Sequence, residues 1–250
     1  MNGIKLLIVA NRLPFSVHKE SNRLSLKKSP GGLVSGLETF LTKSNIDYKW
    51  VGWPGTSLNK KQTQELESII REENLPYIPV YIPEKLMDKF YNGFCNKTLW
   101  PLMHNFSPLA TFSQDYWQSY VEVNKLFLNA LLSFPIEDNE TYVWVHDYHL
   151  MLLPSMLRDA LQNVNIGFFL HIPFPPPETF AQLPWKKEIL EGLLGADLIG
   201  FHTYEYTNNF LRSLSKIINL ESNMGNIIHN GRFIRAETFP MGIDFELFNS

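Results

Sequence analysis

A single cysteine, Cys95, is present among the 250 residues, so an intrachain disulfide is excluded and a reducing compartment is expected. No uncharged apolar run approaches the roughly 20 residues that cross a bilayer, and the amino terminus lacks the pattern of a signal peptide. We therefore interpret the glycosylation-like triplets at Asn96, Asn105 and Asn139 as chance matches. Together these absences predict a cytoplasmic protein.

Positive charge is not in excess either. The chain carries 22 Lys and Arg against 25 Asp and Glu, a formal net charge of −3. Binding to nucleic acids or membrane surfaces depends on clustered Lys and Arg, so we expect neither kind of partner. With 44% hydrophobic residues and no internal repeat or linker, the composition is that of an ordinary globular protein. The oligomeric state stays open, and a homo-oligomer is compatible with the sequence.

Several familiar catalytic patterns are missing as well. No Ser-His-Asp order, no cysteine–histidine pairing, no cluster of metal ligands and no evident pair of glycosidase carboxylates stands out. The sequence therefore does not predict hydrolysis by a nucleophilic triad or metal-assisted chemistry. The residues alone give no positive evidence for a metal or a bound cofactor.

What is present is an alternation of short apolar runs and amphipathic segments. Most runs are nearly continuous, which is typical of parallel strands covered on both faces. The expected strands are Ile4–Ala10, Trp50–Trp53, Tyr77–Ile82, Tyr142–Val145, Ile166–Leu170 and Asp197–Phe201. The expected helices are Leu33–Thr42, Lys61–Asn74, Tyr116–Phe134, Leu150–Leu161, Lys186–Leu194 and Tyr204–Ile218. This order predicts a doubly wound, mostly parallel, Rossmann-like α/β sheet, in which Pro79 places its strand at an edge.

The end of the chain departs from this alternation. Asn230-Gly231 lies between flanks rich in β-branched and aromatic residues, a pattern that predicts a two-residue β-hairpin. The sequence then stops at "MGIDFELFNS", residues 241–250, without a helix C-cap signal.

Residues that follow the strands are the first candidates for a site, because open parallel sheets bind ligands beyond the carboxyl ends of their strands. Arg12 follows the first strand, and its guanidinium can clamp a phosphate or carboxylate; a surface arginine explains it too. Gly31 and Gly32 lead into a helix, whose free backbone amides can receive a phosphate. A flexible turn accounts for these glycines equally well, since they match neither a dinucleotide fingerprint nor a Walker loop.

Aromatic side chains form another candidate. Tyr91 and Trp100 lie in "FYNGFCNKTLWPLMH", residues 90–104, which we interpret as a loop because of its Asn and Gly content. Aromatic rings with polar tips suit the apolar faces and hydroxyls of a sugar. A packed loop without a ligand is an equal alternative.

Asp147 and His171 follow two neighbouring strands. Asp147 can bind substrate hydroxyls, orient a histidine, or simply cap the next helix. His171 is followed by prolines at 173, 175, 176 and 177, which hold the chain extended and rigid beside it. A metal site in "HDYH" does not match the usual ligand spacings. A strand-end histidine next to a rigid turn, paired with a strand-end aspartate, favours a ligand site.

Several segments, taken in order, resemble a known family. They are "NRLP", "PGGLVSGL", "YNGFCNKTLWPLMH", "WQSYVEVN", "VWVHDYHLMLLP", "IGFFLHIPFPPPETF" and "GADLIGFHTYEYTNNFL". They resemble the amino-terminal half of the trehalose-6-phosphate synthases, glycosyltransferase family 20, from about residue 4 to residue 248. "HDYHL" together with "FFLHIPFP" is highly specific for this family.

The resemblance implies that residues 1–250 are the acceptor-side, Rossmann-like domain of a two-domain GT-B enzyme. Family members transfer glucose from UDP-glucose to glucose 6-phosphate with anomeric retention and without a metal, giving trehalose 6-phosphate and UDP. The matching positions are Arg12, Tyr91 and Trp100 for glucose 6-phosphate, Gly31 and Gly32 for the nucleotide diphosphate, and Asp147 and His171 as catalytic and donor-binding contacts of the sugars. Since the leaving phosphate is thought to take the acceptor proton in this family, His171 is not expected to be a general base.

Two departures from the family pattern stand out. Cys95 replaces the usual serine, a mild change in the expected loop. The family's second domain supplies an Arg and Lys pair for the donor diphosphate, and it would lie beyond Ser250. The hairpin and "FPMGIDFELF" resemble the crossing into that domain. We therefore expect half an active site, and an isolated chain that is inactive.

Two alternatives stay open. A glucosylglycerol-phosphate synthase would use similar chemistry with another acceptor. A non-catalytic regulatory or sugar-phosphate-sensing subunit would keep the fold and lack turnover. The donor nucleotide (UDP, ADP or GDP) and a following phosphatase domain are not determined by these residues.

Overall fold

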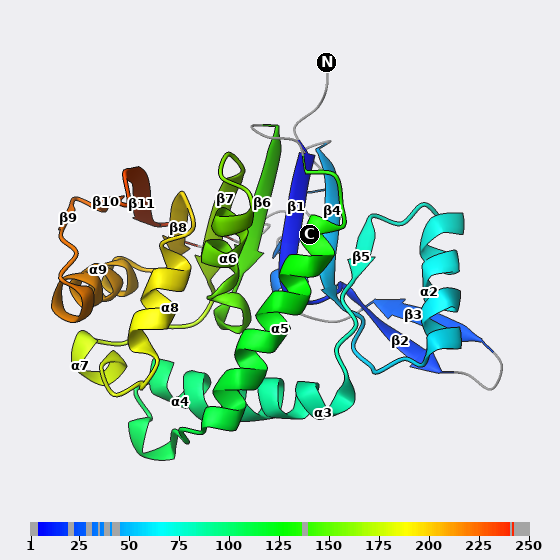
Figure 1. The fold of residues 1–250 in the computed structure, drawn as a ribbon, viewed down its shortest axis with the longest axis horizontal. Helices are drawn as coiled ribbons and strands as arrows, with labels where there is room; N and C mark the ends of the chain where they lie inside the picture. The colour runs from blue at the N-terminus through cyan, green and yellow to red at the C-terminus, as the bar shows by residue number, and fades with distance from the viewer. Residues whose placement is uncertain are drawn as a thin grey trace, which may run out of the picture.

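The apolar runs form one sheet in the computed structural model, which describes residues 5–19, 23–28, 32–34, 36–37, 41, 46–136, 140–240 and 242. Within these ranges the strand order is β5-β4-β1-β6-β7-β8-β11-β10-β9 (Figure 1). The bounds are β1 Lys5–Arg12, β4 Asp47–Trp53, β5 Tyr77–Pro79, β6 Thr141–His146, β7 Asn165–Leu170, β8 Leu198–Phe201, β9 Ser222–Asn223, β10 Asn226–His229 and β11 Arg232–Thr238. The six strands predicted from the sequence are confirmed, and the one containing Pro79 lies at the sheet edge as expected.

The order of the strands reverses between β1 and β6. From β1 the chain adds β4 and β5 on one side, and then β6, β7 and β8 on the other, all in parallel pairs. This is the doubly wound arrangement predicted from the alternating pattern. In such sheets the crevice for a ligand opens at the carboxyl ends of the strands on either side of the reversal. Here those are the ends of β1 and β6.

Helices cover the sheet because its strands are apolar on both faces. The helical bounds are α2 Lys60–Glu72, α3 Glu84–Met87, η1 Asp88–Leu99, α4 Trp100–Met103, η2 Ser107–Leu109, α5 Gln114–Leu132, η3 Tyr148–Leu150, α6 Leu153–Ala160, α7 Pro177–Phe180, α8 Lys186–Leu193 and α9 Tyr204–Ile218. Of the expected helix Leu33–Thr42, residues 33–34, 36–37 and 41 are described and helical; the rest lie outside the described residues. The other five predicted helices are confirmed.

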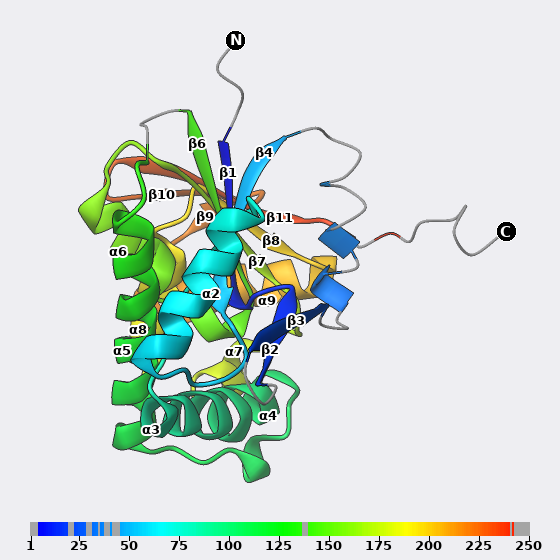
Figure 2. The same cartoon turned by 90° about the vertical axis from the view of Figure 1, so that its right-hand side faces the viewer.

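The alternating side chains of β1 separate two cores. Leu7 and Val9 pack into the larger core, which α5, α6, α8 and α9 cover, whereas Leu6 and Ile8 pack into a smaller one. The smaller core includes the hairpin of β2 (Phe15–Lys19) and β3 (Leu24–Lys28), together with α2. Figure 2 shows α5, α6 and α8 on one side of the sheet and the β2–β3 hairpin on the other. The pairing of β2 with β3 was not predicted, because the sequence between them, residues 20–23, contains no glycine to indicate a turn.

The predicted hairpin at Asn230-Gly231 is confirmed. Both residues have positive φ, 50° and 73°, as a tight turn between β10 and β11 requires. Its β11 strand pairs in parallel with β8, so the hairpin extends this sheet. Its resemblance to a crossing into a second domain stays a prediction. Of the segment after it, residues 239–240 and 242 are described.

The segment from Phe90 to His104, expected to be a loop, is instead helical. It forms most of the π-helix η1, followed by α4, and Cys95 is fully buried in it. Burial raises the pKa of the Cys95 thiol well above its ordinary value. The loop interpretation was wrong because Asn and Gly content was weighed above the apolar residues, Phe90, Phe94 and Leu99 among them, that pack into the core.

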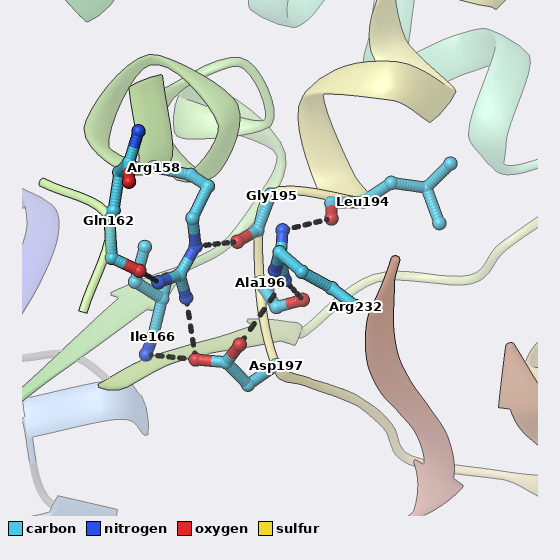
Figure 3. A network of polar contacts seen from close by, with 8 residues as sticks. All are labelled: Arg158, Gln162, Ile166, Leu194, Gly195, Ala196, Asp197 and Arg232. Atoms are coloured by element: carbon cyan, nitrogen blue, oxygen red, sulfur yellow. Dashed lines mark hydrogen bonds and ion pairs between the residues drawn. The ribbon is translucent and has the colours of Figure 1, made fainter. Parts of the chain in front are cut away.

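A network of charged side chains connects neighbouring strands at the amino-terminal edge of the sheet (Figure 3). Asp197 accepts hydrogen bonds from Arg158 at 2.7 Å and Arg232 at 3.1 Å, and from the backbone N–H of Ile166 at 2.9 Å. The two guanidinium groups also donate to the carbonyl oxygens of Gln162, Leu194, Gly195 and Ala196. One carboxylate thus joins α6, β7, β8 and the hairpin strand β11.

We expect Asp197→Ala to lower the free energy of unfolding by about 1–3 kcal/mol, because the nearly buried Arg158 guanidinium loses its anionic partner. Urea denaturation monitored by circular dichroism measures this loss. Asp159→Ala removes an exposed carboxylate from the same helix region and is the matched control. Equal stability of the two variants would contradict a structural role for the network.

Candidate functional site

The residues predicted at the strand ends converge at the carboxyl edge of the sheet. Asp147 follows β6 and His171 follows β7, and these two strands are neighbours. The backbone N–H of Asp147 donates to the carbonyl of Phe169 at 2.8 Å, and the backbone N–H of His171 donates to Asp147 Oδ1 at 3.3 Å. The pairing of Asp147 with His171 expected from the sequence is therefore present.

Asp147 has an unusual backbone conformation and a side chain with an unusually high pKa. Its φ is 74°, a left-handed value that is uncommon for a residue other than glycine and often occurs where a side chain is held for function. Burial raises the pKa of Asp147 to about 6, an increase partly offset by the backbone N–H groups of Tyr148 and His171. Asp147 lies at the N-cap position of η3 but makes no capping hydrogen bond from its side chain. The helix-cap alternative therefore does not explain this residue.

Arg12 ends β1 and remains exposed. Its guanidinium lies over the ring of Trp53, 5.5 Å from the ring centroid, and Nη2 donates to Ser16 Oγ at 3.0 Å. Gly55, at φ 86°, makes room for it, since a Cβ there would lie 2.4 Å from Arg12 Nη2. The carbonyl of Arg12 accepts from Trp50 Nε1 at 3.0 Å, which fixes the backbone. The side chain is held in place and is still accessible to an anion.

Tyr91 lies in the π-helix η1, and Trp100, nine residues later, begins α4. Nine residues make about two and a half turns of an α-helix, at about 3.6 residues per turn, and would point in opposite directions. The i→i+5 hydrogen bonds of a π-helix widen each turn, and the backbone N–H of Trp100 still donates to Cys95 in this manner. Within η1, Tyr91 stacks on His149 and Asn96 Oδ1 accepts from the hydroxyl of Tyr148 at 3.1 Å, so these two side chains face η3.

Tyr91 is joined to the Asp147 region through His149. The rings of Tyr91 and His149 stack with centroids 5.7 Å apart and planes 7° apart, and His149 Nδ1 lies 3.8 Å from Asp147 Oδ2. Burial lowers the pKa of His149 to about 3, and neither ring nitrogen has a hydrogen-bond partner in the described structure. Trp100, 42% exposed, stacks instead on His104 with centroids 4.1 Å apart. The structure thus brings Tyr91, but not Trp100, into the contacts around Asp147.

The glycine pair is the least informative of the predicted features. Gly31 lies outside the described residues. Gly32 is helical and exposed, and a Cβ there would meet nothing within 4 Å among the described atoms. Nothing in the described structure therefore requires glycine at this position, and its assignment to a diphosphate stays a prediction.

Sequence reasoning identified His171 but missed that it belongs to a group of histidines at the ends of successive strands. His146, His171 and His202 follow or end β6, β7 and β8, and His146 Nδ1 lies 3.0 Å from His171 Nε2. The rings of His171 and His202 are 5.4 Å apart. Burial lowers the pKa of His171 to about 4, and His202 contributes to this decrease. The equivalent place of these histidines after each strand was the signal that could have identified them.

The three histidines line a largely apolar cavity of about 340 Å³. Its other walls include Trp144 and Phe169, and the small residue Gly200 leaves it room. Among the described residues no group of three or more His, Cys, Asp and Glu side chains is arranged to hold a metal ion. The site is therefore built from a strand-end carboxylate, neutral imidazoles, an exposed guanidinium and aromatic rings, which suits polar recognition of a sugar and its phosphate.

The topology of the sheet and the site at the carboxyl ends of its strands together define a Rossmann-like domain of the GT-B glycosyltransferase type. Residues 4–250 match the model of Glycosyltransferase family 20, and the chain belongs to this family. It is 44% identical, over 99% of its length and 49% of the relative's, to the UDP-forming alpha,alpha-trehalose-phosphate synthase of Emericella nidulans. The chain spans about half the length of the first curated relatives it matches.

Two solved structures are similar to it. One is a UDP-forming alpha,alpha-trehalose-phosphate synthase from Burkholderia xenovorans in complex with glucose-6-phosphate, with a TM-score of 0.77 and 29% identity over 96% of this chain and 50% of that one. The other is the N-terminal domain of trehalose-6-phosphate phosphatase from Candida albicans, with a TM-score of 0.82 and 28% identity over 98% and 50%. No helix in the described part of the chain is long and apolar enough to cross a membrane.

Proposed function

We propose that this chain is the acceptor-side domain of a retaining glucosyltransferase that moves glucose from UDP-glucose to glucose 6-phosphate. The products are trehalose 6-phosphate and UDP. The observation that carries the proposal is the convergence of Arg12, Asp147 and His171 at the carboxyl ends of β1, β6 and β7, on either side of the strand reversal. A similar synthase has been solved with glucose-6-phosphate bound, which supports the choice of acceptor.

Each residue has a role that its geometry supports. The exposed guanidinium of Arg12 offers a fork of N–H donors to the acceptor phosphate. Asp147, ionised above a pH of about 6, accepts hydrogen bonds from sugar hydroxyls. Tyr91 is held by its stack on His149 and provides an apolar ring face with a hydroxyl at its tip. Trp100 belongs to the same proposed acceptor subsite, on the exposed side of the helix.

The same proposal places the donor near His171. The apolar walls and neutral imidazoles there are suited to a glucosyl unit, and Gly31 and Gly32 would let backbone amides approach its diphosphate. In a retaining transfer on one face, the leaving phosphate oxygen takes the acceptor proton as the new glycosidic bond forms. The chain's own residues then need only orient the two sugars and exclude water.

We further propose that a second domain completes this cleft. The chain spans about half the length of the first curated relatives it matches, and the family resemblance assigns the arginine and lysine pair for the diphosphate to a second domain. The isolated chain is therefore proposed to lack turnover. The reaction as proposed needs no metal and no cofactor. A cytoplasmic location belongs to the same proposal, since Cys95 is the only cysteine.

The test is an assay of UDP release by the complete protein that carries this chain, given UDP-glucose with glucose 6-phosphate or with glycerol 3-phosphate. We expect release with glucose 6-phosphate, and a product whose anomeric protons show the α,α configuration by NMR. Preference for glycerol 3-phosphate would replace the proposal with the glucosylglycerol-phosphate alternative. The same assay on residues 1–250 alone should show negligible release.

A second candidate is a regulatory, sugar-phosphate-sensing domain without turnover. The similarity to the N-terminal domain of a trehalose-6-phosphate phosphatase favours it. Calorimetric binding of glucose 6-phosphate by the complete protein, with no release of the nucleoside diphosphate from UDP-glucose, ADP-glucose or GDP-glucose, would make this second candidate the better one.

A further inference from the structure

The rings of His146 and His171 form a hydrogen bond across a partly buried contact. His146 Nδ1 and His171 Nε2 are 3.0 Å apart, a hydrogen-bond distance, so one of the two nitrogens donates and the other accepts. His146 is fully buried at the end of β6. Burial lowers the pKa of both rings, so that both are neutral at pH 7 and each carries a single proton.

The surroundings of His146 decide the direction of this hydrogen bond. Its other nitrogen, Nε2, is buried and has no hydrogen-bond partner in the described structure. If His171 donated, His146 would carry its proton on Nε2, as a buried N–H without an acceptor. Orphaned N–H groups are rare because their full desolvation penalty is not recovered, whereas an unused acceptor is tolerated more often. The favoured arrangement therefore has His146 Nδ1–H donating to His171 Nε2.

We propose that His146 is a positioning residue that fixes His171 as its Nδ1–H tautomer. His171 then has its single lone pair occupied by His146, and it presents only a hydrogen-bond donor to a ligand. The ring accordingly recognises an acceptor oxygen, such as that of a sugar hydroxyl or a phosphate, and cannot serve as a base.

The other groups around His171 are compatible with this assignment. His202 faces it edge-on, with ring centroids 5.4 Å apart, and Phe169 packs at 4.7 Å. Asp147 accepts the backbone N–H of His171 through Oδ1. No described residue forms a hydrogen bond with His171 Nδ1, which leaves that N–H available. The identity of the ligand rests on the proposed function, whereas the tautomer does not.

The direct test is NMR of the complete protein with ¹⁵N-labelled histidine at pH 7. We expect the His171 signals to show a protonated Nδ1 and an unprotonated Nε2, and those of His146 to show a protonated Nδ1. Spectra of His171→Asn and His146→Asn assign the signals by their disappearance. A protonated Nε2 on His171 would overturn the proposal. Because this readout needs no turnover, the tautomer can stand even if the protein transfers no glucose.

A pair of variants tests what the tautomer does for the reaction. His146→Leu fills the space without a donor, whereas His146→Asn keeps an amide N–H close to the original Nδ1. We expect kcat/KM for UDP-glucose to fall about 10-fold in the leucine variant, as for the loss of one hydrogen bond, and to recover in the asparagine variant. KM for glucose 6-phosphate should change little in either.

Equal activity of the leucine variant and the wild type would overturn the positioning role. Equal losses in both variants would also overturn it, because they indicate a packing defect that a restored donor does not repair. If the leucine variant does not fold, the spectra of the wild type and the asparagine variant still decide the tautomer, and the activity of the asparagine variant still decides whether a donor suffices.

Discussion

Arg12→Ala is expected to raise KM for glucose 6-phosphate roughly 10- to 150-fold, the equivalent of about 1.5–3 kcal/mol for hydrogen bonds to a charged group. The guanidinium lies exposed at the end of β1 and is fixed over Trp53 and by Ser16. Removing it deletes the cation proposed for the acceptor phosphate and leaves the region of His171 untouched. Binding of UDP-glucose, measured by calorimetry without acceptor, should remain nearly unchanged.

Two further variants make this prediction specific. Gly55→Ala keeps the charge but displaces it, since the new Cβ would lie 2.4 Å from Arg12 Nη2; we expect a smaller loss in the same direction. Arg71→Ala removes an exposed arginine from α2 and should leave KM at the wild-type value. An equal loss of affinity for donor and acceptor in Arg12→Ala would contradict the acceptor assignment.

Asp147→Asn is expected to weaken the proposed activity strongly and to stabilise the fold. The amide oxygen can still accept the backbone N–H of His171, but the negative charge proposed to bind sugar hydroxyls is lost. We expect kcat/KM for glucose 6-phosphate to fall roughly 10- to 150-fold. At pH 7 the wild type holds an ionised carboxylate whose pKa is raised from 3.8 to about 6. That difference corresponds to up to about 3 kcal/mol, which the amide recovers.

Protonation of Asp147 changes stability and activity with pH in opposite directions. Between a pH of about 4 and 6 the folded protein binds a proton at Asp147 that the unfolded chain does not, so this residue's contribution to stability increases as the pH falls through that window. Activity changes the opposite way, because kcat/KM should decline below a pH of about 6 as the carboxylate is protonated. The variant should lack both effects.

Urea denaturation and initial rates across this pH range measure the two quantities. Asp115→Asn, which neutralises an exposed carboxylate paired with Lys89, is the matched control and should change neither. A variant that is both inactive and less stable than the wild type would contradict the assignment, since it would indicate that the carboxylate is needed to hold the fold.

The sheet and most of the site's candidates were predictable from local patterns. Continuous apolar runs predicted the central strands, and the positions just after them identified Arg12, Asp147 and His171, because parallel strands align their carboxyl ends at one edge. Asn230-Gly231 predicted its hairpin through the positive φ values that the turn requires. These features depend on residues close together in the sequence, so the sequence by itself determined them.

Other features became apparent only in the tertiary structure. The stacking of Tyr91 on His149 depends on a π-helix, in a segment whose composition led us to predict a loop. The addition of β11 to β8 depends on pairing between segments more than 30 residues apart. The contact of His146 with His171 arises because two strands lie side by side and one ring loses access to water. Burial and the pairing of distant segments set the pKa of Asp147 and the proposed direction of that hydrogen bond, and neither is a property of local sequence.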